Sequence, residues 1–297
     1  MTARVIIFAF LLLTSCVKRA DYDRLKSTSD SLAAKNNANI VIEGSQVYQL
    51  SSKYTGQTYD LYISCPINFK QTGKRYPLLV ALDAEVNFGA VDYISHRLTK
   101  DKMAPELVVV GIAYHGATDE DTYYSIRAKD FTPSEDKEQE NRRKNAYRYG
   151  SGGAENFVKF LSMEALPFLE KNFPIEMNDR ALYGHSFGGL FGAHVLINHP
   201  SLFDRYLILS PSLWWNQNAI MKTFKADSLI AKKIRVYVAT GSLEDTMVGD
   251  QMRMVNHLKQ TGLKTLSVKS EILENETHRS IFGRGFTNGM RYLFESK

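Results

Sequence analysis

The chain has 297 residues, of which 44% are hydrophobic and 11% aromatic, a composition that excludes a disordered chain and allows one sizeable core. The formal net charge is +5, but the 37 basic residues are interspersed with 32 acidic ones and form no basic run. We therefore expect no nucleic-acid partner.

The chain begins with the pattern of a secretory signal peptide. Arg4 supplies a positive charge, and the apolar run 5–13 is too short to cross a bilayer, which takes roughly 20 residues. The Leu-Thr-Ser triplet before Cys16 resembles a bacterial lipobox, in which the cysteine is lipidated. We predict a signal peptide at 1–15 and a lipid anchor on Cys16 that holds the protein in the bacterial cell envelope. The alternative is an ordinary secretory signal with an incidental cysteine.

A polar stretch separates this segment from the folded domain. Residues 18–44 are rich in Ser, Asn, Asp, Lys and Ala, so 16–44 is predicted to be the lipidated cysteine and a flexible tether. From residue 46 apolar and polar residues alternate, and a glycine-containing turn at 55–57 precedes a second alternating run at 59–63. The domain, assigned to 45–297, is thus expected to open with an antiparallel hairpin.

Apolar runs and helical patterns alternate through the rest of the chain. Buried strands are predicted at 78–82, 107–112, 180–183, 206–209, 234–238 and 266–273. Helices are predicted at 154–172, 187–198, 251–261 and 280–295, with Pro167 marking a kink or break in the first. The alternation predicts an α/β fold with a mostly parallel central sheet and helices on both faces.

One long insert of low hydrophobicity interrupts this alternation at about 116–153, and its centre at 134–144 is highly charged. An insert of this length in a compact domain is usually functional or mobile. We expect a lid or a substrate-facing loop.

Gly184, Ser186 and Gly188 match G-x-S-x-G between a predicted strand and a predicted helix. The glycines permit a turn sharp enough to expose the serine oxygen, and the following helix N-terminus favours developing negative charge. Ser186 is therefore the predicted nucleophile of an α/β-hydrolase, against the alternative of an ordinary glycine-rich turn.

Four histidines follow Ser186 and could serve as its base: His194, His199, His257 and His278. The first three fall within or at the end of predicted helices, where packing, the helix dipole or solvation explains them. Only His278 lies just beyond the last strand, where strand ends converge on the nucleophile. His278 is the predicted general base.

An acid is needed to fix the imidazole tautomer of the base, and it should follow the strand at 234–238. The loop offers Glu244, Asp245 and, further on, Asp250. We favour Glu244. The oxyanion should bind the backbone N–H of Phe187 and a second N–H from the loop after the first buried strand, at Ala84 or Glu85.

From about residue 47 onward the chain resembles the esterase family of α/β-hydrolases. That family contains enterochelin and bacillibactin esterases, feruloyl and acetyl-xylan esterase modules, S-formylglutathione hydrolases and mycobacterial mycolyltransferases. The matching segments are 76–83, Arg127 with 130–133, 152–154 with Phe157, 184–189, 210–215, 241–244 and 276–278. The Ser-Pro-Ser-Leu-Trp-Trp run at 210–215 looks most like the siderophore (enterochelin/bacillibactin-type) esterase branch.

The resemblance implies that Glu85 and Phe187 supply the oxyanion donors. Ala84 stands where the family usually has a glycine, and an alanine there costs the loop some backbone freedom. Some members of the family manage with a Ser–His dyad, so the need for Glu244 stays open.

The predicted reaction is cleavage of a carboxylic ester through an acyl-enzyme intermediate, with a small-molecule ester as partner. Arg127, Trp214 and Trp215 are candidates to bind a bulky, anionic, aromatic substrate such as a catecholate siderophore ester. The alternative is that the tryptophans form a structural cover and the arginines of the insert pair with neighbouring acids in water.

Two other functions remain open: a feruloyl or acetyl esterase acting on plant-type acylated glycans, and a non-catalytic ligand-binding lipoprotein on a hydrolase fold. No cofactor is expected. No metal site is expected either, since no pair of histidines or cysteines shows ligand spacing. The sequence leaves the oligomeric state and the membrane leaflet of the anchor open.

Overall fold

The computed structural model describes residues 42–67, 69–222 and 232–295. The predicted signal peptide, Cys16 and most of the tether lie outside the described residues. Within these ranges, no helix combines the length and the apolar character that a membrane crossing requires.

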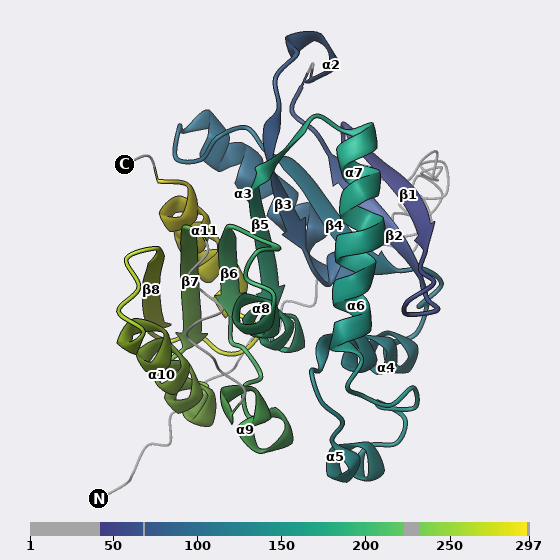
Figure 1. The fold of residues 1–297 in the computed structure, drawn as a ribbon, viewed down its shortest axis with the longest axis vertical. Coiled ribbons are helices and arrows are strands. Elements are labelled where there is room, and N and C mark those ends of the chain that lie inside the picture. The colour runs from purple at the N-terminus through teal and green to yellow at the C-terminus, as the bar shows by residue number, and fades with distance from the viewer. Residues whose placement is uncertain (1–41, 68, 223–231, 296–297) are drawn as a thin grey trace, which may run out of the picture. The chain divides into compact units, whose positions relative to one another are not determined.

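The described domain is built on an eight-stranded sheet with the strand order β1-β2-β4-β3-β5-β6-β7-β8 (Figure 1). The hairpin β1–β2 is antiparallel, β2 pairs antiparallel with β4, and every later pair is parallel. The strands are β1 (Ser45–Ser51), β2 (Thr58–Ser64), β3 (Tyr76–Ala81), β4 (Val108–Tyr114), β5 (Ile175–His185), β6 (Arg205–Leu209), β7 (Ile234–Gly241) and β8 (Leu266–Leu273). The predicted α/β-hydrolase fold and its N-terminal hairpin are confirmed.

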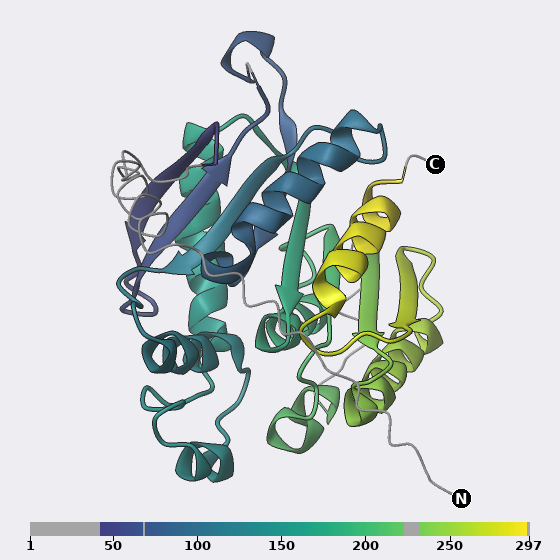
Figure 2. The ribbon, with the colours of Figure 1, turned by 180° about the vertical axis from the view of Figure 1, so that it is seen from behind.

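Helices cover both faces of the sheet because the central strands are apolar on both sides. In β3, Leu78 and Val80 face one core, whereas Leu79 and Ala81 face the other. Figure 2 shows α3 and α11 across one face, and the remaining long helices lie on the opposite face (Figure 1). The helices that form these layers are α3 (Ala84–Lys100) and α11 (Ile281–Phe294) on one side, with α6 (Ala154–Phe160), α7 (Leu166–Asn172), α8 (Phe187–Asn198) and α10 (Asp245–Gln260) on the other.

About half of the insert at 116–153 is helical rather than a loop, and its role as a lid or substrate-facing segment stays a prediction. It contains α4 (Glu120–Phe131) and α5 (Lys137–Arg142). Both helices begin at an aspartate whose side chain accepts a backbone N–H three residues on: Asp119 from Thr122, and Asp136 from Gln139. These caps explain why so polar a segment forms helices.

Two other elements differ from the prediction. The 17-residue helix α3 follows β3 directly, where only a loop was expected. Helix α10 begins at Asp245, six residues before the predicted start at 251. Near Pro167, where a kink or break was predicted, the helical segment contains a π-helical turn, η1 (Leu161–Ala165), which joins α6 to α7 without a break. A π turn leaves room for a proline that cannot donate its own backbone hydrogen bond. The short helices α2 (Phe69–Thr72) and α9 (Trp215–Lys222) complete the described elements.

Candidate active site

The predicted nucleophile, Ser186, lies in a strained turn between β5 and α8. Its backbone has φ 59° and ψ −116°, a conformation that a residue with a side chain rarely adopts. The N–H of Ser186 donates to the carbonyl of Leu209 at 3.0 Å, which ties the turn to the end of β6. A Cβ on Gly184 would lie 2.1 Å from the carbonyl oxygen of Gly188, so the turn requires a glycine at position 184. These features distinguish it from an ordinary glycine-rich turn.

The predicted base and acid are joined in the structure. His278 follows β8, Glu244 follows β7, and His278 Nδ1 lies 2.6 Å from Glu244 Oε2. Close packing of the two loops makes this possible: a Cβ on Gly241 would lie 2.2 Å from the carbonyl oxygen of Glu276, which accepts the N–H of Leu243 at 3.1 Å. Glycine at position 241 therefore sets the approach of the two loops.

The environment of Glu244 keeps its carboxyl group ionised. Burial alone would raise the pKa of Glu244, but hydrogen bonds from His278, from Ser210 Oγ at 2.6 Å and from the N–H of Gly241 at 2.7 Å outweigh it and hold that pKa below its usual value. A carboxylate held in this way accepts the Nδ1 proton of His278 and leaves Nε2 free to take a proton.

The other two candidate acids lie elsewhere. Asp245 begins α10 and is exposed. Asp250 is buried, but its carboxylate accepts a hydrogen bond from Asn218 at 2.9 Å and pairs with Arg253. Of the three acids, the structure thus places Glu244 alone against His278.

Ser186 and His278 line the same cavity, which has a volume of about 500 Å³ and also includes Tyr123, Tyr124 and Arg279. Both predicted reacting side chains are therefore open to one space. A wider depression of about 900 Å³ lies at the opposite ends of the strands, near Pro77 and Arg205, and holds none of these groups.

Motif-based prediction missed His185, the residue before the nucleophile. Its ring is buried, and its centroid lies 4.5 Å from that of His278. Burial, reinforced by the charges of His278 and Arg127, lowers the pKa of His185 to about 4, so the ring is neutral near pH 7. His185 supports one side of the His278 ring without adding a charge next to it.

Arg127, predicted to bind substrate, makes a buried ion pair with the protein itself. Its Nε donates to Asp83 Oδ1 at 2.6 Å, and Nη2 donates to Asp83 Oδ2 and to the His185 carbonyl, each at 2.9 Å. Only 7% of the Arg127 side chain is exposed, and Tyr123 donates a further hydrogen bond to Asp83 at 2.9 Å. Arg127 borders the cavity, but its main contacts fasten α4 to the end of β3 and to the nucleophile turn.

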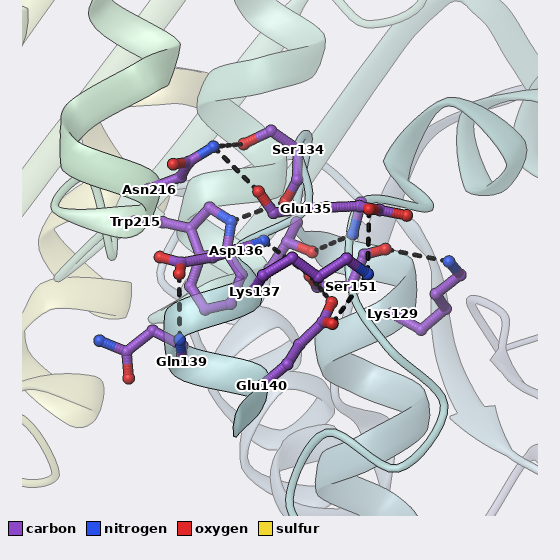
Figure 3. A network of polar contacts seen from close by, with 12 residues as sticks. Lys129, Ser134, Glu135, Asp136, Lys137, Gln139, Glu140, Ser151, Trp215 and Asn216 are labelled. Atoms are coloured by element: carbon purple, nitrogen blue, oxygen red, sulfur yellow. Dashed lines mark hydrogen bonds and ion pairs between the residues drawn. The ribbon is translucent and has the colours of Figure 1, made fainter. Parts of the chain in front are cut away.

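Trp215 is 1% exposed and belongs to the hydrophobic core, so the prediction that its ring contacts substrate is wrong. Its Nε1 donates to the Ser134 carbonyl at 2.8 Å, within the polar network shown in Figure 3. In that network Asn216 also donates to Ser134 Oγ and to the Glu135 carbonyl, so the tryptophan and asparagine together hold the charged insert. For Trp215, the alternative given above, that the tryptophan forms a structural cover, agrees with the structure. Trp214 is 37% exposed beside Phe187, and its contact with substrate stays a prediction.

The two predicted oxyanion donors lie at helix starts, where backbone N–H groups have no partner within the helix. Phe187 is the first residue of α8, and Glu85 lies in the first turn of α3. The Glu85 carboxylate accepts the N–H of Tyr114, and burial raises the pKa of Glu85 to about 7. The left-handed residue of this turn is Asp83, with φ 58°, so the turn does not require a glycine at position 84.

Among the described residues, one group of histidine and carboxylate side chains is close enough to share a metal ion: Glu155, His194 and His199. None of the three lines the cavity of Ser186.

Comparison with known proteins places this geometry in a family. A family model described as "Putative esterase" matches residues 52–282. The chain is 32% identical over 228 residues to the ferri-bacillibactin esterase BesA of Bacillus subtilis, covering 74% of this chain and 77% of that protein. It is 31% identical to the siderophore triacetylfusarinine C esterase of Aspergillus fumigatus, over 58% of this chain and 57% of that protein. The crystal structure of the BES protein from Bacillus cereus superimposes with a TM-score of 0.77 at 26% identity, over 88% of this chain and all (100%) of that one.

Proposed function

The chain belongs to the "Putative esterase" family and is a carboxylic ester hydrolase, and on this premise we propose that it cleaves siderophore esters. In this proposal Ser186 is the nucleophile, His278 is the general base, and Glu244 is the acid that orients His278. One observation carries the catalytic assignment. His278 is bound to Glu244 at 2.6 Å while it lines the same cavity as Ser186.

In the proposed reaction, Ser186 Oγ attacks the ester carbonyl carbon and its proton passes to His278 Nε2. The oxyanion binds the N–H groups of Phe187 and Glu85, and the departing alcohol takes the proton from His278. Water then repeats the sequence on the acyl-enzyme: it gives a proton to His278, attacks the acyl carbon and releases the acid as Ser186 Oγ is reprotonated.

The substrate class is proposed from the relatives and from the cavity. Relatives named as siderophore esterases match most of the domain. The cavity carries the half-exposed ring of Tyr124 and the exposed guanidinium of Arg279, beside His278. An aromatic face and a cation together suit a catecholate, which is both aromatic and anionic. Arg279 takes the binding role that the sequence assigned to the buried Arg127.

A fluorophosphonate probe tests the nucleophile. We expect the folded protein to be labelled at Ser186 and the Ser186→Ala variant to remain unlabelled. Ser212→Ala is the matched control, because the Ser212 hydroxyl lies only 3.4 Å from that of Ser186 and should not be needed for labelling. Absence of label in the folded wild-type protein would favour the non-catalytic binding lipoprotein.

Hydrolysis of three esters tests the substrate class: a catecholate trilactone siderophore with and without iron, methyl ferulate, and an acetylated sugar. We expect the trilactone to have the highest kcat/KM. Preference for the ferulate or the sugar would instead support action on plant-type acylated glycans.

We also propose that Cys16 carries lipid and anchors the enzyme in the cell envelope. The lipobox-like triplet before Cys16 supports this. Mass spectrometry of the mature N-terminus should find acyl chains on Cys16, and Cys16→Ser should release the protein from the membrane fraction. An unmodified cysteine in the mature protein would contradict the anchor.

A further inference from the structure

We propose that Glu155, His194 and His199 form a Zn²⁺ site at the far end of α8 from Ser186. This site is separate from ester cleavage and does not depend on the proposed function. His194 lies in α8, His199 directly follows its last residue, and Glu155 lies in the first turn of α6. With a rise of about 1.5 Å per residue, His199 is roughly 18 Å along the helix from the start of α8.

The distances suit ligands of a single ion. His194 Nε2 lies 2.9 Å from Glu155 Oε1, His199 Nε2 lies 3.1 Å from Glu155 Oε2, and the three ligand atoms of the group lie within 4.8 Å of one another. Two ligand atoms bound to zinc at about 2.0–2.1 Å are roughly 2.9 to 3.4 Å apart, depending on the angle between them. The two half-exposed side chains, Glu155 and His199, can rotate to close the remaining gap.

The most buried ligand gives the strongest indication. His194 is 5% exposed, and its Nε2 is held 2.9 Å from Glu155 Oε1. A buried ring nitrogen and a carboxylate oxygen at this distance, with a second imidazole on the same carboxylate, are the arrangement that a metal ion completes.

The surroundings supply the other requirements of a zinc site. Asn198 Nδ2 lies 3.1 Å from His194 Nδ1 and donates to the His194 carbonyl at 3.2 Å, so the Asn198 side chain holds the His194 ring in place. The three ligands border an open cavity of about 310 Å³ walled by Pro133, Ser134 and Ala219. Water from this cavity can fill the fourth position.

Nitrogen ligands select the ion. Two imidazoles and one carboxylate suit Zn²⁺ and its neighbours in the first transition row, whereas Ca²⁺ and Mg²⁺ prefer oxygen ligands alone. Bound zinc would fasten the first turn of α6 to the end of α8.

The test is a zinc titration of the untagged full-length protein, stripped with a chelator and followed by competition with a chromophoric chelator. We expect one tight equivalent of Zn²⁺, a visible absorption band when Co²⁺ replaces it, a higher Tm with zinc, and no uptake of Ca²⁺. His199→Gln and Glu155→Gln should each weaken zinc binding at least about 100-fold, since loss of an outer hydrogen-bond partner alone costs 10- to 100-fold.

His96→Gln is the matched control, because His96 pairs with a carboxylate, Asp92, at 3.2 Å but has no second histidine beside it. It should bind zinc as the wild type does. Hydrolysis of a simple ester by the stripped protein and by each variant verifies folding and should be unchanged. Failure of the wild type to take up zinc, or equal uptake by His199→Gln, would overturn the site.

Discussion

Replacing Arg127 tests whether this residue holds the active site together or binds substrate. Arg127→Ala removes two charge-assisted hydrogen bonds to Asp83 and one to the His185 carbonyl, and it leaves the Asp83 carboxylate, 3% exposed, without its cation. Removing one partner of a buried ion pair costs about 3–5 kcal/mol. Because a domain is stable by only about 5–15 kcal/mol, this is a large share of the total.

Urea denaturation measures this loss of stability. An unchanged slope of unfolding free energy against urea concentration would show that wild type and variant expose the same surface on unfolding. Arg142→Ala is the matched control from the same insert, because its pair with Glu138, at 3.7 Å, is exposed, and such pairs contribute at most about 1 kcal/mol. Asp83→Asn completes a double-mutant cycle with Arg127→Ala, since asparagine tolerates the left-handed backbone at position 83. The structural interpretation fails if the free energy of unfolding of Arg127→Ala lies within about 1 kcal/mol of the wild-type value while the KM of the variant rises.

Three further changes have outcomes that the structure specifies. Ser186→Ala should lower kcat by about 10⁶-fold, measured in single-turnover hydrolysis, with binding of substrate retained. Glu244→Gln should lower kcat by about 10⁴-fold without unfolding the protein, because its oxygen can still accept from Ser210 while its amide nitrogen forces the wrong tautomer on His278. Burial raises the pKa of Asp130 to about 7, despite the hydrogen bond from Tyr59, so its contribution to stability is complete below about pH 4 and is lost as the pH rises through 7. Urea midpoints at pH 5 and pH 8 should therefore differ less in Asp130→Asn than in the wild type, and an identical pH dependence of the two proteins would contradict this.

The sheet and the nucleophile turn could be predicted because their signals are local. Each central strand is a short apolar run, and the G-x-S-x-G pattern has a strand before it and a helix after it. The order Ser, acid, His then pointed to Glu244 and His278, which the structure places 2.6 Å apart. The sequence favoured Glu244 over Asp245 but could not decide between them, because the choice depends on where α10 begins. Since the helix starts at Asp245, Glu244 points back toward Gly241.

Features that depend on distant partners escaped prediction. Arg127 carries the same charge whether it faces a ligand or Asp83, and only the packing of α4 against β3 decides between them. Trp215 looked like a candidate for a binding cleft because nothing local reveals that its indole N–H meets the Ser134 carbonyl, 81 positions earlier in the chain. His194 and His199 are five residues apart, a spacing that does not place two side chains on one face of a helix. They meet because the chain leaves the helical path at His199, where φ is −133° and ψ is 49°.

The alanine at position 84 shows how one departure from a family pattern is accommodated. The turn after β3 needs one left-handed residue, and Asp83 supplies it. Position 84 therefore does not need the backbone freedom of a glycine. The constraint at position 84 is space. A Cβ on Gly111, in the neighbouring strand β4, would lie 2.7 Å from the Cβ of Ala84, so room for the alanine comes from the absence of a side chain on β4. Helix α3 therefore begins directly after Asp83, and the N–H of Glu85 keeps its place in the first turn, where the proposed oxyanion site requires it.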